Sequence, residues 1–172
     1  MRMFVAIALP ETIRAACERL QQGVPGARWV PPENMHLTLR FLGEVGGGDF
    51  DDLMHALADV VVPPFEIEVA GVGHFETRQV PTTLWAGIKP SPELKHLQAK
   101  VERAVRSIGL PPETRKFVPH ITLARLGESD PIRIRIEILA GPSCTTEELL
   151  ADPGDVLELQ IDQNFLHSRQ CR

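Results

Sequence analysis

The chain has 172 residues and a net charge of −5, with 43% hydrophobic and 24% charged residues. This composition is typical of a globular domain and excludes a largely disordered chain, a fibrous repeat and a membrane span. The net negative charge excludes nucleic-acid binding by bulk electrostatic attraction, so any RNA contact has to be local, at a few arginines. Three scattered cysteines without a C-x-x-C pair predict reduced thiols, and the apolar run 4–9 is too short for a signal peptide. We therefore expect a cytoplasmic protein.

Hydrophobic patterning predicts alternating strands and helices. Continuous or alternating apolar residues predict strands over residues 3–9, 36–42, 65–69, 83–88 and 118–126. Apolar residues at helical spacing predict helices over residues 10–22, 49–61 and 92–108. Pro10 and Pro92 suit the first position of their helices, and Asp49 is a candidate N-cap. Further along, residues 132–138 favour a strand, with a short helix as the alternative, and residues 156–161 predict a last strand.

A nine-residue segment occurs twice. His36-Leu-Thr-Leu-Arg-Phe-Leu-Gly-Glu44 aligns with His120-Ile-Thr-Leu-Ala-Arg-Leu-Gly-Glu128, with six of nine positions identical and 84 residues between the two histidines. Each copy follows a predicted strand and an amphipathic helix, so the whole unit of strand, helix and motif strand occurs twice. A duplicated half-domain explains this arrangement better than coincidence does.

Side-chain alternation places the polar residues of each copy on one face of its strand. His36 and Thr38 point to one side while the leucines between and after them point to the other, and the same holds for His120 and Thr122. If the two halves pack about a pseudo-twofold axis, their polar faces meet across a groove. Two imidazoles and two hydroxyls would then surround one small ligand.

Two facing histidines suit acid–base chemistry at neutral pH, because the imidazole pKa is about 6.5 and one ring can be neutral while the other is protonated. The neutral ring takes a proton from an attacking water or hydroxyl, and the protonated ring gives one to the leaving oxygen. Threonine hydroxyls donate to anionic oxygens, and together with a guanidinium they match a tetrahedral phosphate. The pattern predicts a phosphodiester substrate and requires no metal.

Other interpretations of these residues are weaker. A single H-x-T on a strand is usually a partly exposed histidine, so it is the duplication that favours catalysis. A metal site at His36 and His120 would need a third ligand at a suitable spacing, and the sequence offers none. No cysteine has the basic, helix-terminal setting that favours a thiolate. The remaining histidines are interpreted as exposed helix, loop or strand-end residues: His55, His74, His96 and His167.

At its two motifs the sequence resembles the 2H phosphoesterase superfamily, and within it the RNA 2′,3′-cyclic phosphodiesterase family, also called LigT-like or 2′-5′ RNA ligase. The likeness covers the H-x-T-x motifs at residues 36–39 and 120–123 and their surroundings at Met3–Pro10, Arg28–His36, Phe41–Glu44, Leu84–Gly87 and Phe117–Arg125. It implies one α+β domain over residues 1–172, built as a two-lobed pseudo-symmetric duplication. Antiparallel sheets would line a central cleft, with helices on the outside.

The resemblance also implies an activity and residue roles. It implies hydrolysis of a terminal RNA 2′,3′-cyclic phosphate to a 2′-phosphomonoester, without metal or cofactor. His36 would be the proton donor to the leaving 3′ oxygen, and His120 would be the proton acceptor that activates water. Thr38, Thr122 and Arg125 would bind the phosphate. In the reverse direction, attack by a 5′-hydroxyl would give ATP-independent 2′-5′ ligation.

Two arginines lie within the motif strands, and their spacing from the histidine and threonine predicts which face each one occupies. Arg125 lies three residues after Thr122, so a regular strand would turn it away from the histidines. A twist or bulge near Ala124 is needed to bring it to their side. Arg40 lies four residues after His36, so we expect it to share the histidine face and to contact RNA at the cleft edge.

Other basic and aromatic residues near the motifs are candidate RNA contacts. Arg115 and Lys116 precede the second motif and are either contacts to the RNA backbone or part of a solvated loop. Phe41 and Trp29 are candidates for stacking a base. For Phe41, burial in the core is the favoured alternative.

Two further functions remain open. The first is a phosphodiesterase for another small cyclic phosphate, such as a nucleotide or an ADP-ribose derivative. The second is a non-catalytic module that binds RNA ends, although binding alone does not need two titrating histidines. We expect a monomer without a membrane, metal or cofactor partner, acting on RNA that ends in a 2′,3′-cyclic phosphate.

Overall fold

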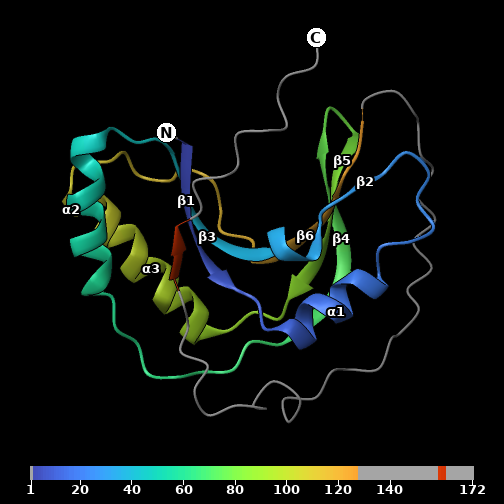
Figure 1. Ribbon diagram of the computed structural model, residues 1–172, viewed down its shortest axis with the longest axis horizontal. Coiled ribbons are helices and arrows are strands. Elements are labelled where there is room, and N and C mark those ends of the chain that lie inside the picture. Colours follow the sequence, from blue (N-terminus) through green and yellow to red (C-terminus); the bar gives the residue numbers. More distant parts are fainter. Residues whose placement is uncertain (1, 128–158, 162–172) are drawn as a thin grey trace.

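The computed structural model describes residues 2–127 and 159–161. Its elements, in chain order, are β1 (Arg2–Ala8), α1 (Glu11–Arg19), β2 (Arg28–Trp29), the 3₁₀ helix η1 (Pro32–Asn34), β3 (His36–Glu44), α2 (Gly47–Ala58), β4 (Val69–Thr77), β5 (Val80–Ile88), α3 (Pro92–Ser107), β6 (His120–Arg125) and β7 (Leu159–Ile161). The described part thus combines an antiparallel sheet with three α-helices (Figure 1), which confirms the predicted α+β class.

The strands form one seven-stranded sheet in the order β4-β5-β6-β3-β1-β7, with β2 also paired to β6. Each of the described pairings is antiparallel. The two motif strands, β3 and β6, are neighbours at the centre of the sheet and pair at Leu37 and Ile121. Strands β1 and β7 lie beyond β3, and strands β5 and β4 lie beyond β6. The sheet therefore has two halves, each built around one motif strand.

Two helical segments contact the half of the sheet to which they do not belong in the sequence. α1 connects β1 to β3, yet the side-chain amide of Gln21, two residues beyond its end, donates to the carbonyl of Leu123 on β6 at 3.0 Å. α3 connects β5 to β6, yet it packs against β3 and α2. In Figure 1, α2 and α3 lie together on the side of β1 and β3, and α1 lies on the side of β4 and β5. Each half of the chain thus contributes a helix to the other half.

The longest helix shows how local sequence sets the element boundaries. α3 begins after Ser91, whose Oγ accepts from the Leu94 N–H at 3.2 Å, and Pro92 lies in the first turn, where no backbone donor is needed. Gly109 follows its end at φ +89°, a left-handed conformation that favours glycine. The side chains that α3 buries are Leu94, Leu97, Val101 and Val105.

Buried side chains from both halves form one main core cluster. Val5 of β1, Leu53 of α2, Val101 of α3 and Ile121 of β6 belong to it and are fully buried. Since the helices cover this apolar face, the opposite face of the motif strands is where polar side chains can gather. In residues 2–127 and 159–161, none of the helices has both the length and the apolar character needed to cross a membrane.

Most predicted elements are confirmed, with shifted ends. The structure contains the strands predicted over residues 3–9, 36–42, 83–88 and 118–126, the three predicted helices, and residues 159–161 of the predicted last strand. The N-cap of α2 is Gly46, so the prediction for Asp49 is wrong and that residue lies in the first turn. Pro10 is the N-cap of α1 and not its first residue. The prediction for residues 132–138 lies outside the described residues.

The strand predicted over residues 65–69 is wrong, because strand pairing begins only at its last residue and continues through β4. Two glycines interrupt the apolar alternation of β4. Gly73 is required there, since a Cβ would lie 2.3 Å from Cη2 of Trp85 on β5. The hairpin between β4 and β5 turns through Arg78–Gln79 at φ 52° and 65°, without the Asn-Gly pair that signals such a turn. These features explain why the alternation pattern misses β4.

Candidate active site

The register of the two motif strands brings both copies of the repeat to one place. Leu37 pairs with Ile121 in an antiparallel ladder, so the histidine of each strand lies across from the threonine of the other. In such a ladder the Cβ atoms of diagonal neighbours, here the two histidines, are about 7–8 Å apart or slightly less. That spacing leaves room for one tetrahedral phosphate. We call these four residues the quartet: His36, Thr38, His120 and Thr122.

Burial confirms the predicted faces of both strands. The four apolar residues that alternate with the quartet are at most 4% exposed: Leu37, Leu39, Ile121 and Leu123. All members of the quartet are partly exposed. The polar residues of both copies therefore share one face of the sheet, and the aliphatic residues face the core.

Both histidines are held by the same backbone arrangement. Nδ1 of His36 lies 2.9 Å from the carbonyl oxygen of Asn34, and Nδ1 of His120 lies 2.7 Å from that of Val118. A carbonyl oxygen can only accept, so Nδ1 carries the hydrogen in each ring. In each ring, Nε2 is then the nitrogen that can accept a proton.

Aromatic side chains orient the two rings differently. His36 stacks on Phe4, with ring centroids 4.5 Å apart and planes at 19°. His120 meets Phe75 edge-on, at 4.8 Å and 87°, and the centroid of Trp85 lies 6.2 Å away. Phe4 and Trp85 belong to ordinary apolar strand patterns, and Phe75 lies on β4, which the pattern misses, so the sequence gives no local signal that these rings support the histidines.

Burial is the main cause that lowers the pKa of His120 below its ordinary value of 6.5. The charge of Arg125 lowers this pKa further, whereas the hydrogen bond to the Val118 carbonyl partly opposes the shift. The neutral form of His120 therefore predominates at neutral pH. A neutral imidazole with its hydrogen on Nδ1 can accept a proton at Nε2.

Arg125 reaches the face of the quartet through a β-bulge. Thr122 pairs with Trp85 of β5, but Leu84, the residue before Trp85, pairs with Ala124, so β6 carries one extra residue here. The extra residue shifts the alternation of side chains between the two faces of the strand. Arg125, which pairs with Thr83, therefore lies on the same face as Thr122. Its Nη1 donates to Oγ1 of Thr83 at 2.9 Å. The bulge that the sequence requires near Ala124 is present.

A matching bulge in β3 contradicts the expectation for Arg40. Thr38 and Arg40 pair with consecutive residues of β1, so the alternation of side chains shifts between them. Arg40 therefore points to the face opposite His36. Its side chain is 6% exposed, and its Nε donates to Glu102 of α3 at 2.6 Å. The prediction that Arg40 shares the histidine face is wrong, which removes this residue from the candidate RNA contacts.

Phe41 takes the place in β3 that Arg125 takes in β6. It pairs with Phe4, with ring centroids 6.1 Å apart, so it lies on the face of the quartet. Its side chain is 40% exposed, and the favoured interpretation as a core residue is therefore wrong. Trp29 pairs with Ala124, faces the other side and packs against the core, so it is not a base platform.

A chain of charged groups holds Arg115 beside Phe41. Glu113 accepts from Nε and Nη2 of Arg115 at 3.1 and 3.0 Å, and the guanidinium carbon lies 5.8 Å from the centroid of Phe41. Nη1 of Arg40 lies 3.6 Å from the Glu113 carboxylate, and Glu102 accepts from the Glu113 N–H at 3.1 Å. The hydrogen bond from Arg115 is the main cause that lowers the pKa of Glu113 to about 2. Arg115 is thus exposed but fixed in direction.

Two other places are poor candidates for chemistry. Within residues 2–127 and 159–161, no group of three or more His, Cys, Asp or Glu side chains is placed to hold a metal ion. Burial raises the pKa of the Cys17 thiol to about 11, which does not suit a nucleophile.

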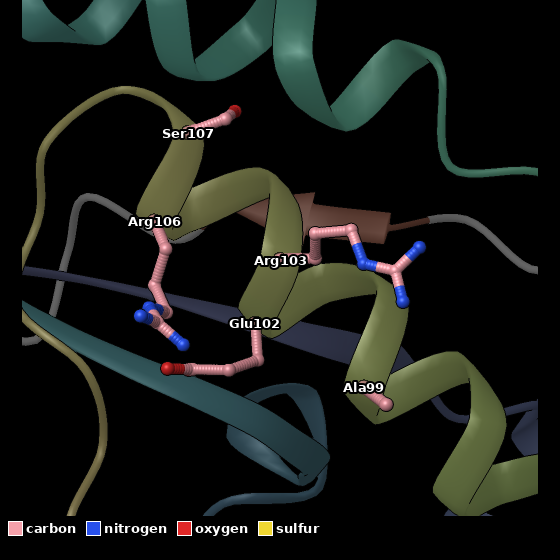
Figure 2. Close-up of a pocket in the computed structure, with 5 residues that line it drawn as sticks. All are labelled: Ala99, Glu102, Arg103, Arg106 and Ser107. Carbon is pink, nitrogen blue, oxygen red and sulfur yellow. The ribbon is translucent and has the colours of Figure 1, made fainter.

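A pocket of about 420 Å³ runs along α3 (Figure 2) and is lined by Ala99, Glu102, Arg103, Arg106 and Ser107. It contains no member of the quartet.

The site therefore combines two oppositely placed imidazoles, two hydroxyl donors and one guanidinium on a single face. Two groups that exchange protons near neutral pH can serve attack and departure at one centre. Hydroxyl and guanidinium donors match the oxygens of a phosphate. The arrangement suits a phosphate ester, and the class of protein that the fold and site define is a phosphoesterase.

Comparisons with known proteins identify the family within that class. A family model described as LigT like Phosphoesterase matches residues 7–85 and 88–140, and the chain belongs to this family. The RNA 2′,3′-cyclic phosphodiesterase of Archaeoglobus fulgidus is 34% identical over 134 residues, which cover 76% of this chain and 76% of that protein. These matches confirm the resemblance seen in the motifs.

Solved structures confirm the LigT-like fold. A crystal structure of a Thermus thermophilus protein has a TM-score of 0.69 and 30% identity, covering 77% of this chain and 78% of that chain. The crystal structure of E. coli LigT complexed with 3′-AMP has a TM-score of 0.64 and 32% identity, covering 76% of each chain. Both likenesses extend over about three quarters of the chain.

Proposed function

We propose that this enzyme hydrolyses RNA 2′,3′-cyclic phosphate ends to 2′-phosphomonoesters by two-histidine acid–base catalysis. The observation that carries the proposal is the pairing of Leu37 with Ile121, because it sets both histidines and both threonines around one point. The name shared by its relatives, RNA 2′,3′-cyclic phosphodiesterase, supports the substrate class.

The reaction is one in-line displacement at phosphorus. Nε2 of His120 accepts a proton from water, and the water oxygen forms a bond to phosphorus. The bond from phosphorus to the 3′ oxygen breaks, and Nε2 of His36 donates a proton to that oxygen. The products are a 2′-phosphomonoester and a 3′-hydroxyl. The lowered pKa of His120 supports its assignment as the acceptor, because an acceptor has to be neutral before the reaction.

The remaining residues of the site bind the substrate. Thr38, Thr122 and Arg125 donate to the phosphate oxygens, and their position on one face supports this role. Phe41 offers an exposed ring on which a base can stack. Arg115, beside that ring, and the exposed Lys116 contact the RNA backbone. No step requires a metal or another cofactor.

The same residues allow ligation as a second reaction of the same type. If a 5′-hydroxyl attacks in place of water, the product is a 2′-5′ linkage formed without ATP. The enzyme acts as a single two-lobed domain, and we propose a monomer in the cytoplasm. Size-exclusion chromatography with light scattering tests the monomer directly.

A second candidate function keeps the site and changes the substrate to a small cyclic phosphate, such as a nucleotide or an ADP-ribose derivative. The neighbour E. coli LigT has been crystallised in complex with NADP⁺ and with ATP, which favours a site able to hold small nucleotides. A third function, binding of RNA ends without catalysis, is less suited to two titrating groups.

One experiment separates these functions. The protein is incubated in EDTA with either an oligoribonucleotide ending in a 2′,3′-cyclic phosphate or a cyclic mononucleotide, and product release is followed. We expect turnover of the RNA end, unaffected by the chelator. Turnover of the mononucleotide alone would favour the second candidate, and turnover of neither would favour the binding module. Loss of activity in EDTA would contradict the metal-independent mechanism.

A further inference from the structure

Arg28 brings a second guanidinium to the face of the quartet. In the short ladder between β2 and β6, Arg28 pairs directly with Arg125. Residues directly opposite in an antiparallel ladder project to the same face. Because the bulge in β6 turns Arg125 to the side of Thr122, Arg28 projects to that side as well. The sequence contains no local signal for this pair, since 97 residues separate its members.

No carboxylate in residues 2–127 forms an ion pair with either arginine. In the part of the chain that the structure describes, the ion pairs involve Arg14, Arg40, His74, Lys89 and Arg115, and neither Arg28 nor Arg125. Arg125 has the hydroxyl of Thr83 as a partner, and Arg28 is exposed. Burial and the nearby charge of Arg28 both lower the pKa of Arg125.

Like charges placed directly opposite each other destabilise a sheet. This chain has 23 acidic and 18 basic residues, so carboxylates that could neutralise the pair are plentiful. Among the described residues, neither guanidinium has a carboxylate partner at the edge of the site, and an anion that binds between the two guanidiniums explains this arrangement. Guanidinium groups bind phosphate oxygens through two parallel N–H bonds. The chemistry points to a phosphate group.

The reacting phosphate does not need Arg28. A cyclic phosphodiester carries one negative charge and two non-bridging oxygens, and Thr38, Thr122 and Arg125 already supply donors for them. Along the open face, the arginine pair lies at one end of the quartet and Phe41 at the other. Arg28 lies directly across from Arg125, on the edge of β6 that also pairs with β3, and is free of the role that the reacting phosphate gives to Arg125.

We propose that Arg28, together with Arg125, forms a second anion subsite that binds a phosphodiester of the RNA next to the reacting cyclic phosphate. This inference rests on the proposed function and adds to it a requirement for RNA longer than one nucleotide. The phosphodiester comes either from the same strand or, in ligation, from the strand that brings the attacking 5′-hydroxyl. Both sources present the same chemistry to Arg28.

The test compares substrates with one and with several phosphates. Arg28→Ala and the wild type are assayed on a cyclic mononucleotide and on a short oligoribonucleotide with the same terminal base and a 2′,3′-cyclic end. We expect the ratio of kcat/KM for the oligonucleotide to that for the mononucleotide to fall about tenfold, through KM. The slope of log kcat/KM against log salt for the oligonucleotide should become shallower by about one. An equal fall on both substrates would overturn the second subsite.

Controls separate binding from folding. Arg103→Ala removes the same charge from an exposed side chain of α3 that lines the pocket in Figure 2, and it should leave the substrate ratio unchanged. Thermal unfolding gives a second readout. Removing one of two repelling charges should leave the Tm of Arg28→Ala unchanged or higher, whereas a structural role for Arg28 predicts a lower Tm.

Two further experiments distinguish the two sources of the phosphodiester and separate the subsite from the proposed function. If ligation to an added 5′-hydroxyl oligonucleotide loses efficiency while hydrolysis does not, the phosphodiester belongs to the incoming strand. Binding of an oligonucleotide that already ends in a 2′-phosphate, followed by fluorescence anisotropy, does not depend on turnover. A wild type without turnover would contradict the proposed function, and weaker binding by Arg28→Ala would still support the subsite. Equal binding by the two proteins would overturn it.

Discussion

The two motif strands are alike in their first four residues and differ afterwards. In both β3 and β6, the histidine is held through Nδ1 by the carbonyl two residues earlier, and one extra residue then changes the parity. The next residue on the open face is Phe41 in β3 and Arg125 in β6. The residue before it is the buried, charged Arg40 in one strand and the small Ala124 in the other.

This difference shows how a nearly symmetric frame suits an asymmetric substrate. On the proposed function, the shared part of the strands surrounds a phosphate with two non-bridging oxygens. The part that differs offers an aromatic ring at one end and a guanidinium at the other. An RNA end also has an apolar base on one side and anionic groups on another. On the proposed function, the residues after the bulges therefore set the orientation in which the substrate binds.

Both histidines belong to the part that the two motif strands share, and removing either one should have the largest effect on activity. We expect His36→Ala and His120→Ala each to lower kcat on RNA 2′,3′-cyclic ends by about 10²–10⁴-fold, since each removes one proton transfer. Release of the 2′-phosphomonoester measures the rate. His55→Ala, which changes a histidine on α2 outside the site, is the control and should keep the wild-type rate. A near-normal rate for either site variant would refute the acid–base assignment.

Arg40→Ala gives β3 the residue that β6 has at the same position. The substitution leaves Glu102 without its closest cation in a buried setting, so we expect a loss of about 3–5 kcal/mol in the free energy of unfolding, measured with urea. Arg14→Ala removes an arginine paired with an exposed glutamate and should cost about 0.5 kcal/mol or less. Equal losses for the two variants would show that the buried network contributes little.

Arg125→Gln removes the cation from β6 and keeps a hydrogen-bond donor. Because a bond to a charged group contributes about 1.5–3 kcal/mol, we expect kcat/KM to fall about 10- to 100-fold. The fall should already appear on the mononucleotide, in contrast to Arg28→Ala, because Arg125 binds the reacting phosphate. Arg125→Lys retains the charge but not the planar fork and should recover part of the loss. An unchanged kcat/KM in Arg125→Gln would contradict a phosphate contact.

Phe41→Leu tests the aromatic end of β3. Stacking on an aromatic side chain contributes about 1–3 kcal/mol per base, so we expect KM for the RNA end to rise about tenfold, with a smaller change in kcat. Phe41→Trp keeps a ring for stacking and is the matched variant, which should remain near the wild-type KM. If leucine and tryptophan give the same KM, the ring does not bind a base.

The smallest effect concerns the titration of His120. Its folded-state pKa lies below the ordinary value, so the folded protein binds fewer protons there than the unfolded chain. This contribution to stability is complete above pH about 6.5 and is lost as the pH falls through the folded pKa. NMR titration of the His120 ring should give a midpoint below 6.5. Phe75→Ala should raise that midpoint, because desolvation is the main cause, and an unmoved midpoint would exclude a role for this ring.

The sequence is sufficient where the pattern is local. Alternation in the two repeats predicts the faces of His36 and Thr38, and the position of Arg125 predicts the bulge in β6. The expectation for Arg40 assumes a regular strand, although the repeat implies the same bulge in β3, and it is wrong for that reason. The exposure of Phe41 also follows from that bulge.

Other features depend on contacts between distant residues and have no local signal. Arg40 and Glu102 are 62 residues apart, and only the packing of α3 on β3 brings them together. β4 lacks an alternating pattern because Gly73 makes space for Trp85. Tertiary packing decides these positions, and propensity does not.

The exchange of helices between the halves has a consequence for how the molecule comes apart. Since α1 belongs to the first half but is bonded to β6 through Gln21, and α3 belongs to the second half but packs on β3, neither strand–helix–strand unit carries its own cover. A chain cut between residues 61 and 68 would yield two fragments, each with bare apolar strands. Each fragment would therefore lack the helix with which the other covers it, so the two parts of the sheet depend on each other for stability.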